Sequence, residues 1–277
     1  MPVKSLDYKS GRTLICGIVN VTPDSFSDGG RYLSAEAAAA RAFELESEGA
    51  DLIDLGAESS RPGSAGISAE EELARLLGPL RRMIKKLHVP VSIDTCKPEV
   101  AAACLAEGAA IINDITGFTD EEMVRAAADA GAGAVIMHML GRPRDMQKAP
   151  VYAKGCVTEV YGFLKERAAA LSEAGIKDIV LDPGVGFGKT LQDNLDIMAG
   201  LGRFRELGRP LLLGVSRKSF IDALYPSEPA ERLPGTIAAC AVCALNGADI
   251  IRVHDVREAV QAMAVVDAIK KRPVFNK

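Results

Sequence analysis

The sequence has 277 residues, of which 48% are hydrophobic and 25% are charged, so the chain can bury a large core. A formal net charge of −4 argues against nucleic acid or an anionic membrane as the main partner, although a basic site can exist within an acidic protein. The segment from Met1 to Lys9 is charged and no apolar run approaches the roughly 20 residues of a membrane span, so we expect a cytoplasmic protein.

Eight short apolar segments are predicted to be strands, and five of them follow a helix end and a glycine in a weak internal repeat. In chain order they are TLICGIVN (13–20), EGADLIDLG (48–56), VPVSIDT (89–95), EGAAIINDI (107–115), AGAGAVIMH (130–138), AGIKDIVLD (174–182), PLLLGVS (210–216) and NGADIIRVH (246–254). Near-continuous apolar strands of this kind are typical of a parallel sheet that helices cover on its faces.

Helical patterns separate these strands. The first begins at Ser34, and another follows Ser68, which has capping-box spacing with Glu71. Strict alternation of strand and helix indicates an α/β protein, and eight such units fit a closed (β/α)8 TIM barrel better than an open doubly wound sheet. Since no Pro/Gly/Ser-rich linker divides the chain, we expect a single domain over residues 1–277.

The six cysteines lack the spacing of a disulfide framework. Cys240 and Cys243 form a C-x-x-C pair, but they lie in the apolar helical run GTIAACAVCALNGA without a second pair of ligands. We interpret them as small core residues of a cytosolic protein rather than as a redox or zinc site.

The active site of a TIM barrel lies at the carboxyl ends of the strands and in the loops that follow. Nearly every predicted strand ends in a group that can hydrogen-bond or carry charge: Asn20, Glu58 to Arg61, Asp94, Asn113, Asp114, His138, Asp182, Ser216, Arg217, Lys218, Arg252, His254 and Asp255. The cations Arg61, Lys218 and Arg252 suit a phosphorylated substrate, because arginine forks match phosphate oxygens. The acids Asp94 and Asp182, with Asn113, suit a flat heterocycle that offers several N–H donors.

Strand alternation adds an orientation to these residues. Ser216 and Lys218 are two positions apart, as are Arg252 and His254, so each pair faces the same way wherever the chain is extended. Asp54 precedes the end of its strand, and the sequence leaves open whether it has a functional role or only fills a polar layer of the barrel.

Two motifs resemble known ligand sites without matching them. DPGVGFGKT (182–190) is similar to a phosphate loop, but three residues separate Gly184 from Gly188 where that loop needs four. His138 has no second His or Cys at ligand spacing, so we favour a hydrogen-bonded structural histidine over a metal ligand.

The polar stretch NVTPDSFSDGG (20–30) has little local reason to be ordered. An Asx/Pro turn is the simplest interpretation, but it does not explain the aromatic Phe26 in such a segment.

Nine motifs occur in order from residue 17 to residue 256. They are GIVNVTPDSFSDGG (17–30), GAESSRPG (56–63), SIDT (92–95), INDI (112–115), MHMLGRPRDMQ (137–147), LDPGVGFGKT (181–190), GVSRKSF (214–220), ERLPGT (231–236) and IRVHDV (251–256). Together they resemble the dihydropteroate synthases of bacterial folate biosynthesis over almost the whole chain.

The resemblance implies a Mg2+-dependent TIM-barrel transferase that is usually a homodimer. It would join 6-hydroxymethyl-7,8-dihydropterin pyrophosphate to p-aminobenzoate, giving 7,8-dihydropteroate and pyrophosphate. Pyrophosphate would leave first, and the pterin cation that remains would be attacked by the arylamine. Sulfonamides, which copy p-aminobenzoate, would bind in its slot.

The resemblance also assigns roles to residues of this sequence. The pterin pocket would hold Asp94, Asn113, Met137, Asp182, Phe187 and Lys218. Pyrophosphate would meet Asn20, Ser60, Arg61, Arg252 and His254, with Asn20 also reaching the magnesium ion. The p-aminobenzoate and sulfonamide slot would be formed by Phe26, Pro62, Phe187, Ser216 and Lys218. The residues expected to act in catalysis are Asp94, Lys218, Asp28 and Arg61.

Loops 17–30 and 56–66 resemble the two mobile loops that close over bound pterin in this family, so their ordering would accompany substrate binding. Ala57 and Ser60 depart from the usual Gly and Thr of the second loop. Two alternatives remain open. One is a pterin-binding barrel that transfers a methyl group to a corrinoid protein, a family without the TPDSFSDGG and SRK segments. The other is a homologue without catalytic activity.

Overall fold

Eight parallel strands form one sheet in the computed structural model, which describes residues 8, 11–21, 35–60 and 63–272. The strands are β1 (Leu14–Asn20), β2 (Leu52–Gly56), β3 (Val91–Asp94), β4 (Ile111–Asp114), β5 (Gly133–Met137), β6 (Ile179–Asp182), β7 (Leu212–Gly214) and β8 (Ile250–Val253). Hydrogen-bonded neighbours follow the order β6-β5-β4-β3-β2-β1-β8-β7. Each predicted strand is therefore present, and consecutive strands are neighbours in space.

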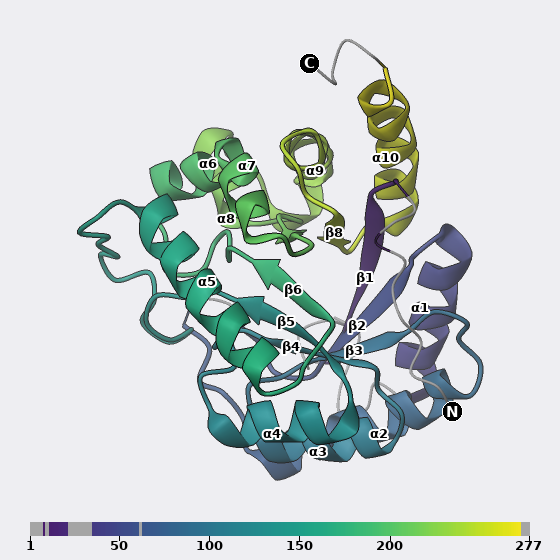
Figure 1. Cartoon of the computed structure of the whole chain (residues 1–277). Helices are drawn as coiled ribbons and strands as arrows, with labels where there is room; N and C mark the ends of the chain where they lie inside the picture. Colours follow the sequence, from purple (N-terminus) through teal and green to yellow (C-terminus); the bar gives the residue numbers. More distant parts are fainter. Residues whose placement is uncertain (1–7, 9–10, 22–34, 61–62, 273–277) are drawn as a thin grey trace.

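The sheet closes on itself between β6 and β7. A parallel bridge pairs Leu181 with Leu211, and the backbone N–H of Leu181 donates to the carbonyl of Pro210 at 2.9 Å. Figure 1 shows the helices arranged around the outside of this ring of strands. The predicted (β/α)8 barrel is confirmed.

Helices follow every strand, with two after β6 and two after β7. They are α1 (Ala35–Glu48), α2 (Ala69–Ile84), α3 (Pro98–Ala106), α4 (Glu121–Ala130), α5 (Cys156–Glu173), α6 (Leu191–Ala199), α7 (Leu201–Phe204), α8 (Ser219–Leu224), α9 (Leu233–Leu245) and α10 (Val256–Lys270), with short 3-10 turns η2 (Arg205–Leu207) and η3 (Pro229–Glu231). Ser34, where the first helix was expected to begin, lies outside the described residues.

Local capping signals set several helix ends. The Ser68 side chain accepts a hydrogen bond from the backbone N–H of Glu71 at 3.2 Å, so its predicted capping role at the start of α2 is confirmed. Asp120 caps α4 in the same manner, and Gly131 ends that helix at φ 64°, in the left-handed region that favours glycine.

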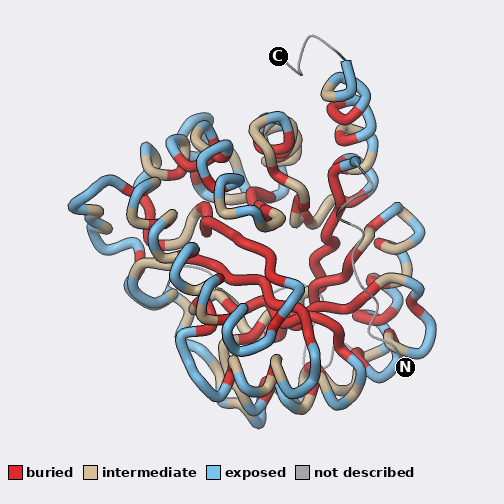
Figure 2. The backbone as a smooth tube through the Cα atoms, in the orientation of Figure 1, coloured by how far each residue is buried: buried red, intermediate tan, exposed pale blue. Residues whose placement is uncertain are grey.

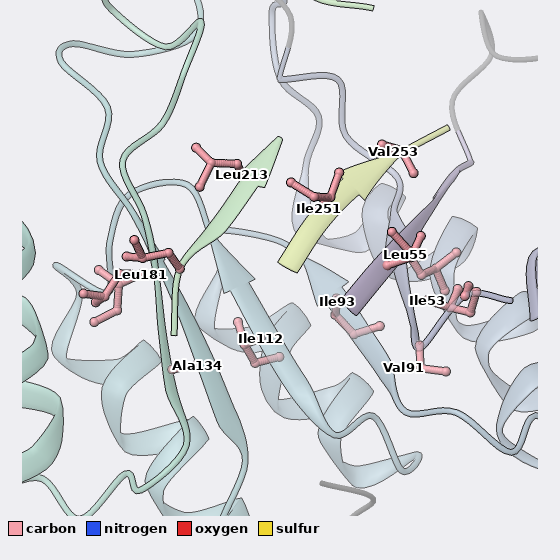
Figure 3. Close-up of a cluster of buried hydrophobic side chains, with 14 of the residues drawn as sticks. Ile53, Leu55, Val91, Ile93, Ile112, Ala134, Leu181, Leu213, Ile251 and Val253 are labelled. Atoms are coloured by element: carbon pink, nitrogen blue, oxygen red, sulfur yellow. The ribbon is translucent and has the colours of Figure 1, made fainter. Parts of the chain in front are cut away.

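Alternation along the strands divides the core into two parts. Side chains that face the helices form the larger cluster, and Figure 3 shows Ile53, Ile93, Ile112, Leu213 and Ile251 among them. The alternate side chains form a separate cluster inside the barrel: Leu14, Cys16, Leu52, Ala110, Ile111, Val135, Val180, Leu212 and Ile250. Figure 2 shows the strands buried and the outer faces of the helices exposed.

Cys240 and Cys243 are fully buried, unpaired residues of α9, as expected for core positions. Among the helices of the described part of the chain, we find none with the length and apolar character that a bilayer crossing requires.

The close approach of two loops gives a test of this architecture. A Cβ on Gly184, which follows β6 and has φ +71°, would lie 1.9 Å from the carbonyl oxygen of His138. Gly131 has φ +64° with nothing within 4 Å, so it isolates the cost of the backbone conformation. We expect Gly131→Ala to cost about 1–2 kcal/mol, and Gly184→Ala to cost roughly 1–3 kcal/mol more because the loops must separate. Urea unfolding of both variants measures this difference, and equal losses would contradict the close loop contact.

Candidate functional site

A layer of polar side chains lies above the apolar interior of the barrel, at the end where the strands stop. In β2, β4, β6 and β8 an interior apolar residue is followed two positions later by a polar one, which points the same way. The pairs are Leu52 and Asp54, Ile111 and Asn113, Val180 and Asp182, and Ile250 and Arg252. We call Asp54, Asp94, Asn113, Asp182 and Arg252 the polar layer.

Arg252 is the centre of a hydrogen-bond network that includes four of the five residues of the polar layer. Its Nε donates to Asp54 Oδ2 at 2.6 Å, and its Nη2 donates to Asp94 Oδ2 at 2.7 Å. Asn113 Nδ2 donates to the same oxygen of Asp54 at 3.0 Å. Burial works against the charge of Arg252, but Asp54 and Asp94 outweigh it and raise the pKa of the guanidinium. The side chains of four different strands are thus held in one network.

The sequence grouped Arg252 with the cations for a phosphorylated substrate and apart from the acids for a heterocycle. Its guanidinium lies among the acids, between Asp54 and Asp94. Asp54, whose role the sequence left open, is a central member because it binds both Arg252 and Asn113. Its interior position follows from its spacing to Leu52, but its main partner is 198 residues away in the chain, so local sequence carries no sign of the contact.

The two acids predicted for a heterocycle lie at the ends of β3 and β6 and are poorly solvated. Burial raises the pKa of Asp94, with Arg252 opposing the shift, and burial likewise raises the pKa of Asp182, with Lys218 opposing it. Asp182 Oδ1 also accepts a hydrogen bond from the backbone N–H of Gly184 at 2.7 Å. Carboxylates removed from water gain most from ligand N–H groups, because hydration no longer satisfies their oxygens.

Lys218 and Phe187 lie together beside the polar layer. Lys218 is the N-cap of α8, and its Nζ lies 4.6 Å from the centroid of the Phe187 ring. The same ammonium group donates to the carbonyl of Val185. Burial lowers the pKa of Lys218 to about 8, while Asp182 acts in the opposite direction. The structure therefore brings together the two residues that were expected to serve both substrates.

Ser216 and His254 meet across β7 and β8, with Ser216 Oγ 2.9 Å from His254 Nδ1. The extended chain assumed for residues 216 to 218 is wrong, because Arg217 has φ 57° and its Nε donates to Asp255 Oδ2 at 3.0 Å. Ser216 is positioned by its contact with His254, which follows the neighbouring strand, and not by strand alternation with Lys218.

Asn20 ends β1 beside Asp94. A Cβ on the intervening Gly56 would lie 3.3 Å from Asp94 Cβ and 3.7 Å from Asn20 Oδ1. Among the described residues no three His, Cys, Asp or Glu side chains come together in a way that could hold a metal. Mg2+ commonly takes only one or two protein oxygens and completes its shell with water and substrate phosphates. The amide oxygen of Asn20 would serve as a protein ligand for an ion bound in this way. It would not suffice for a metal centre whose ligands all come from the protein.

The remaining predicted residues divide into described and undescribed positions. Met137 is buried at the end of β5, and Ser60 is half-buried just before residues 61–62, which lie outside the described part of the chain. Four residues assigned to the closing loops lie outside the described residues: Phe26, Asp28, Arg61 and Pro62.

His138 has the structural role favoured from the sequence. Its Nδ1 lies 3.1 Å from Lys189 Nζ, and its ring contacts the ring of Phe163 edge-on at 5.1 Å between centroids. Burial, followed by the charge of Lys189, lowers the pKa of His138 to about 3, so the imidazole is neutral. Lys189 was not singled out from the sequence, although its motif was considered both as a phosphate loop and as part of the family resemblance; its place directly after three glycines was the available signal.

Comparisons with known proteins agree on one family. Residues 16–254 match the family described as pterin binding enzyme. Dihydropteroate synthase of Escherichia coli (strain K12) is 45% identical over 256 residues, which are 92% of this chain and 90% of that protein. The Yersinia pestis dihydropteroate synthase, solved with a sulfonamide drug complex, superposes with a TM-score of 0.92 at 39% identity and 98% coverage of both chains. The Xanthomonas albilineans enzyme in complex with 7,8-dihydropteroate gives a TM-score of 0.86 at 42% identity, covering 98% of this chain and 97% of that one.

Asp54 allows the network to be tested by stability alone. Its side chain is 1% exposed, so Asp54→Asn leaves Arg252 with one carboxylate partner, and we expect a loss of about 2–4 kcal/mol in the free energy of unfolding. Asp51→Asn is a control at a less buried ion pair: Asp51 pairs with the half-exposed Arg12, and the asparagine oxygen can still accept the hydrogen bond from the backbone N–H of Ile15, so the change should cost less than about 1 kcal/mol. Chemical denaturation measures both losses. An Asp54 variant as stable as the Asp51 variant would remove Arg252 from its central position.

Proposed function

The chain belongs to the family of pterin binding enzymes, and we infer that it is a dihydropteroate synthase, a transferase of folate biosynthesis. It joins 6-hydroxymethyl-7,8-dihydropterin pyrophosphate to p-aminobenzoate, giving 7,8-dihydropteroate and pyrophosphate. The observation that carries this inference is that Arg252, which binds Asp94 Oδ2 at 2.7 Å, meets Lys218: a Cβ on Gly214 would lie 3.8 Å from Lys218 Nζ and 3.9 Å from Arg252 Cδ. These groups combine acceptors for a donor-rich ring with cations for an anionic leaving group.

Pterin binding follows from the acceptors of the polar layer. Asp94 and Asp182 can each accept from a ring N–H and an adjacent exocyclic amine. Asn113 donates its Nδ2 to Asp54, so its amide oxygen remains available as a third acceptor. Arg252 and Asp54 do not need to touch the ring in this arrangement, since they hold Asp94 and Asn113 in place. Met137 and Phe187 would contact the faces of the ring.

Bond cleavage precedes bond formation in the proposed mechanism. The bond between the exocyclic carbon and the pyrophosphate oxygen breaks with its electron pair leaving on pyrophosphate, and the pterin keeps a delocalised positive charge. Asp94, held by Arg252, is placed to stabilise that charge. The arylamine lone pair then forms the new C–N bond, and the amine proton passes to solvent. A strong general base is unnecessary, because the carbon is already activated.

The pyrophosphate site is proposed to combine Asn20, Ser60, Arg61, Arg252 and His254. Arg252 uses Nε and one N–H of Nη2 within the polar layer, so its other N–H groups remain for a phosphate oxygen. Ser216 holds His254 by its Nδ1, which orients the imidazole. Asn20 would hold Mg2+, and the ion when bound supplies neutralisation of charge on the leaving group.

The p-aminobenzoate slot is proposed to lie against Phe187, Lys218 and Ser216, with Phe26 and Pro62 completing it. A sulfonamide would occupy this slot and compete with p-aminobenzoate. Catalytic contributions from Asp28 and Arg61 through loop closure are proposed from the resemblance of their loops. A cytoplasmic location stays a prediction, in keeping with six cysteines that are all free.

The activity is tested with purified protein, both substrates and Mg2+, by measuring pyrophosphate release and dihydropteroate formation. We expect EDTA to suppress turnover, excess Mg2+ to restore it, and a sulfonamide to raise the KM for p-aminobenzoate without lowering kcat.

Lys218→Ala should raise both substrate KM values by about 10-fold or more, equivalent to about 1.4 kcal/mol of lost binding at each site. Folded protein that releases no pyrophosphate would refute the assignment and favour a homologue without catalytic activity.

We further propose that the protein is a homodimer through α9 and α10, which pack against each other. These two helices carry four of the seven large apolar side chains that are exposed among the described residues: Val242, Leu245, Val265 and Ile269. An exposed apolar face of this kind is typical of a protein interface.

Two matched double variants test the dimer. Val265→Lys with Ile269→Lys places charges on α10, and we expect light scattering to show the mass of two chains falling to that of one. Leu224→Lys with Tyr225→Lys changes two residues near the end of α8 that are at least as exposed, and it should leave the dimer intact. A wild-type monomer, or a dimer that survives the α10 changes, would refute this interface.

A further inference from the structure

The loop after β6 is held by side chains along its whole length. We call residues 183–190 the glycine loop. Four consecutive carbonyls in it each accept a hydrogen bond from a different side chain: Val185 from Lys218 Nζ, Gly186 from Gln147 Nε2 at 2.9 Å, Phe187 from Lys189 Nζ at 3.0 Å, and Gly188 from Tyr152 Oη at 2.8 Å. Because four consecutive carbonyls are each bound by a different side chain, the backbone position of this loop is closely determined.

Glycines let the glycine loop lie directly on the segment after β5. Gly184 and Gly188 have φ +71° and +60°, and a Cβ on Gly188 would lie 2.2 Å from the carbonyl oxygen of Leu140. The corresponding contact of Gly184 is with the carbonyl of His138. The two backbones therefore touch, and the polar groups at their junction need an internal partner.

Lys189 is that partner. It is 2% exposed, and its Nζ lies 3.0 Å from the carbonyl oxygen of Phe187, 3.3 Å from that of His138 and 3.1 Å from His138 Nδ1. An ammonium group has three N–H donors, which equals these three acceptors. Because His138 is neutral, its Nδ1 can accept. The contacts join the two loops to each other through one side chain.

The residues that Lys189 influences belong to the substrate site. Phe187, whose carbonyl it binds, has its ring against Lys218, and both residues are proposed for the pterin pocket and for the p-aminobenzoate slot. Asp182 interacts electrostatically with Lys189, which favours the ionised carboxylate. Burying a lysine without a carboxylate in direct contact is unfavourable, so the position is costly for a purely structural donor.

We propose that Lys189 is a positioning residue for p-aminobenzoate. Its hydrogen bond to the Phe187 carbonyl fixes the backbone of Phe187, and the fixed backbone determines where the ring lies between the arylamine slot and the pterin pocket. The proposal rests on the proposed function and adds to it a buried residue that touches neither substrate. Tyr152 binds the neighbouring carbonyl of Gly188, which has no side chain to position. A comparison of Lys189 with Tyr152 therefore distinguishes general support of the loop from placement of the Phe187 ring.

The test compares Lys189→Met with Tyr152→Phe in the full-length protein. Each change removes hydrogen bonds to the glycine loop, so both should lower the denaturant midpoint of unfolding. Lys189→Met should raise the KM for p-aminobenzoate about 10-fold while the KM for the pterin pyrophosphate changes less than about 3-fold. Tyr152→Phe should leave both KM values within about 2-fold of wild type. The inhibition constant of a sulfonamide should rise in parallel with the KM for p-aminobenzoate.

Other outcomes overturn the proposal. A folded Lys189→Met protein with wild-type KM for p-aminobenzoate would show that Lys189 does not place the ring. Equal KM changes in Lys189→Met and Tyr152→Phe would show general loosening of the loop. If Lys189→Met does not fold, Lys189→Gln replaces it; its amide offers two N–H groups to three acceptors, so the KM for p-aminobenzoate should still rise at least about 3-fold. An unchanged KM in that folded variant is equally decisive. Inactive wild-type protein would instead refute the proposed function.

Discussion

The paired contact of Arg252 with Asp54 and Asp94 is the interaction on which the site depends. It ties β8 to β2 and β3, and through Asn113 it reaches β4. Each of these groups is removed from most solvent, so none can be deleted without leaving another polar group unsatisfied. A network of this kind holds its members in one geometry before any ligand arrives. Ligand acceptors that are fixed in advance lose little entropy on binding.

The apolar interior below the polar layer makes that network effective. Leu52, Ile111, Val180 and Ile250 exclude water from beneath the charges, and the effective dielectric constant falls accordingly. Burial consequently raises the pKa of Asp94 and Asp182, and cations beside them oppose the rise. The balance leaves carboxylates that interact strongly with a cationic or donor-rich ring.

The glycine loop and the polar layer represent two ways of fixing a site. Four of the five side chains of the polar layer bind one another, whereas the backbone of the glycine loop is held by three side chains from other segments and by its own Lys189. Lys218 takes part in both, because its ammonium binds the Val185 carbonyl and lies beside Asp182 and Arg252. A residue with this position links the place where pterin would bind to the place where the arylamine would enter.

The sequence by itself determined the eight strands, their alternation with helices, the cap at Ser68 and the strand ends that carry polar groups. These features depend on local physics: period-two burial, glycine at helix ends and capping hydrogen bonds. Only the tertiary structure decided that Arg252 lies among the acids, that Asp54 holds it, and that Lys189 joins two loops. Those outcomes depend on partners up to 198 residues away, and the periodicity of one strand contains no information about the charges on its neighbours.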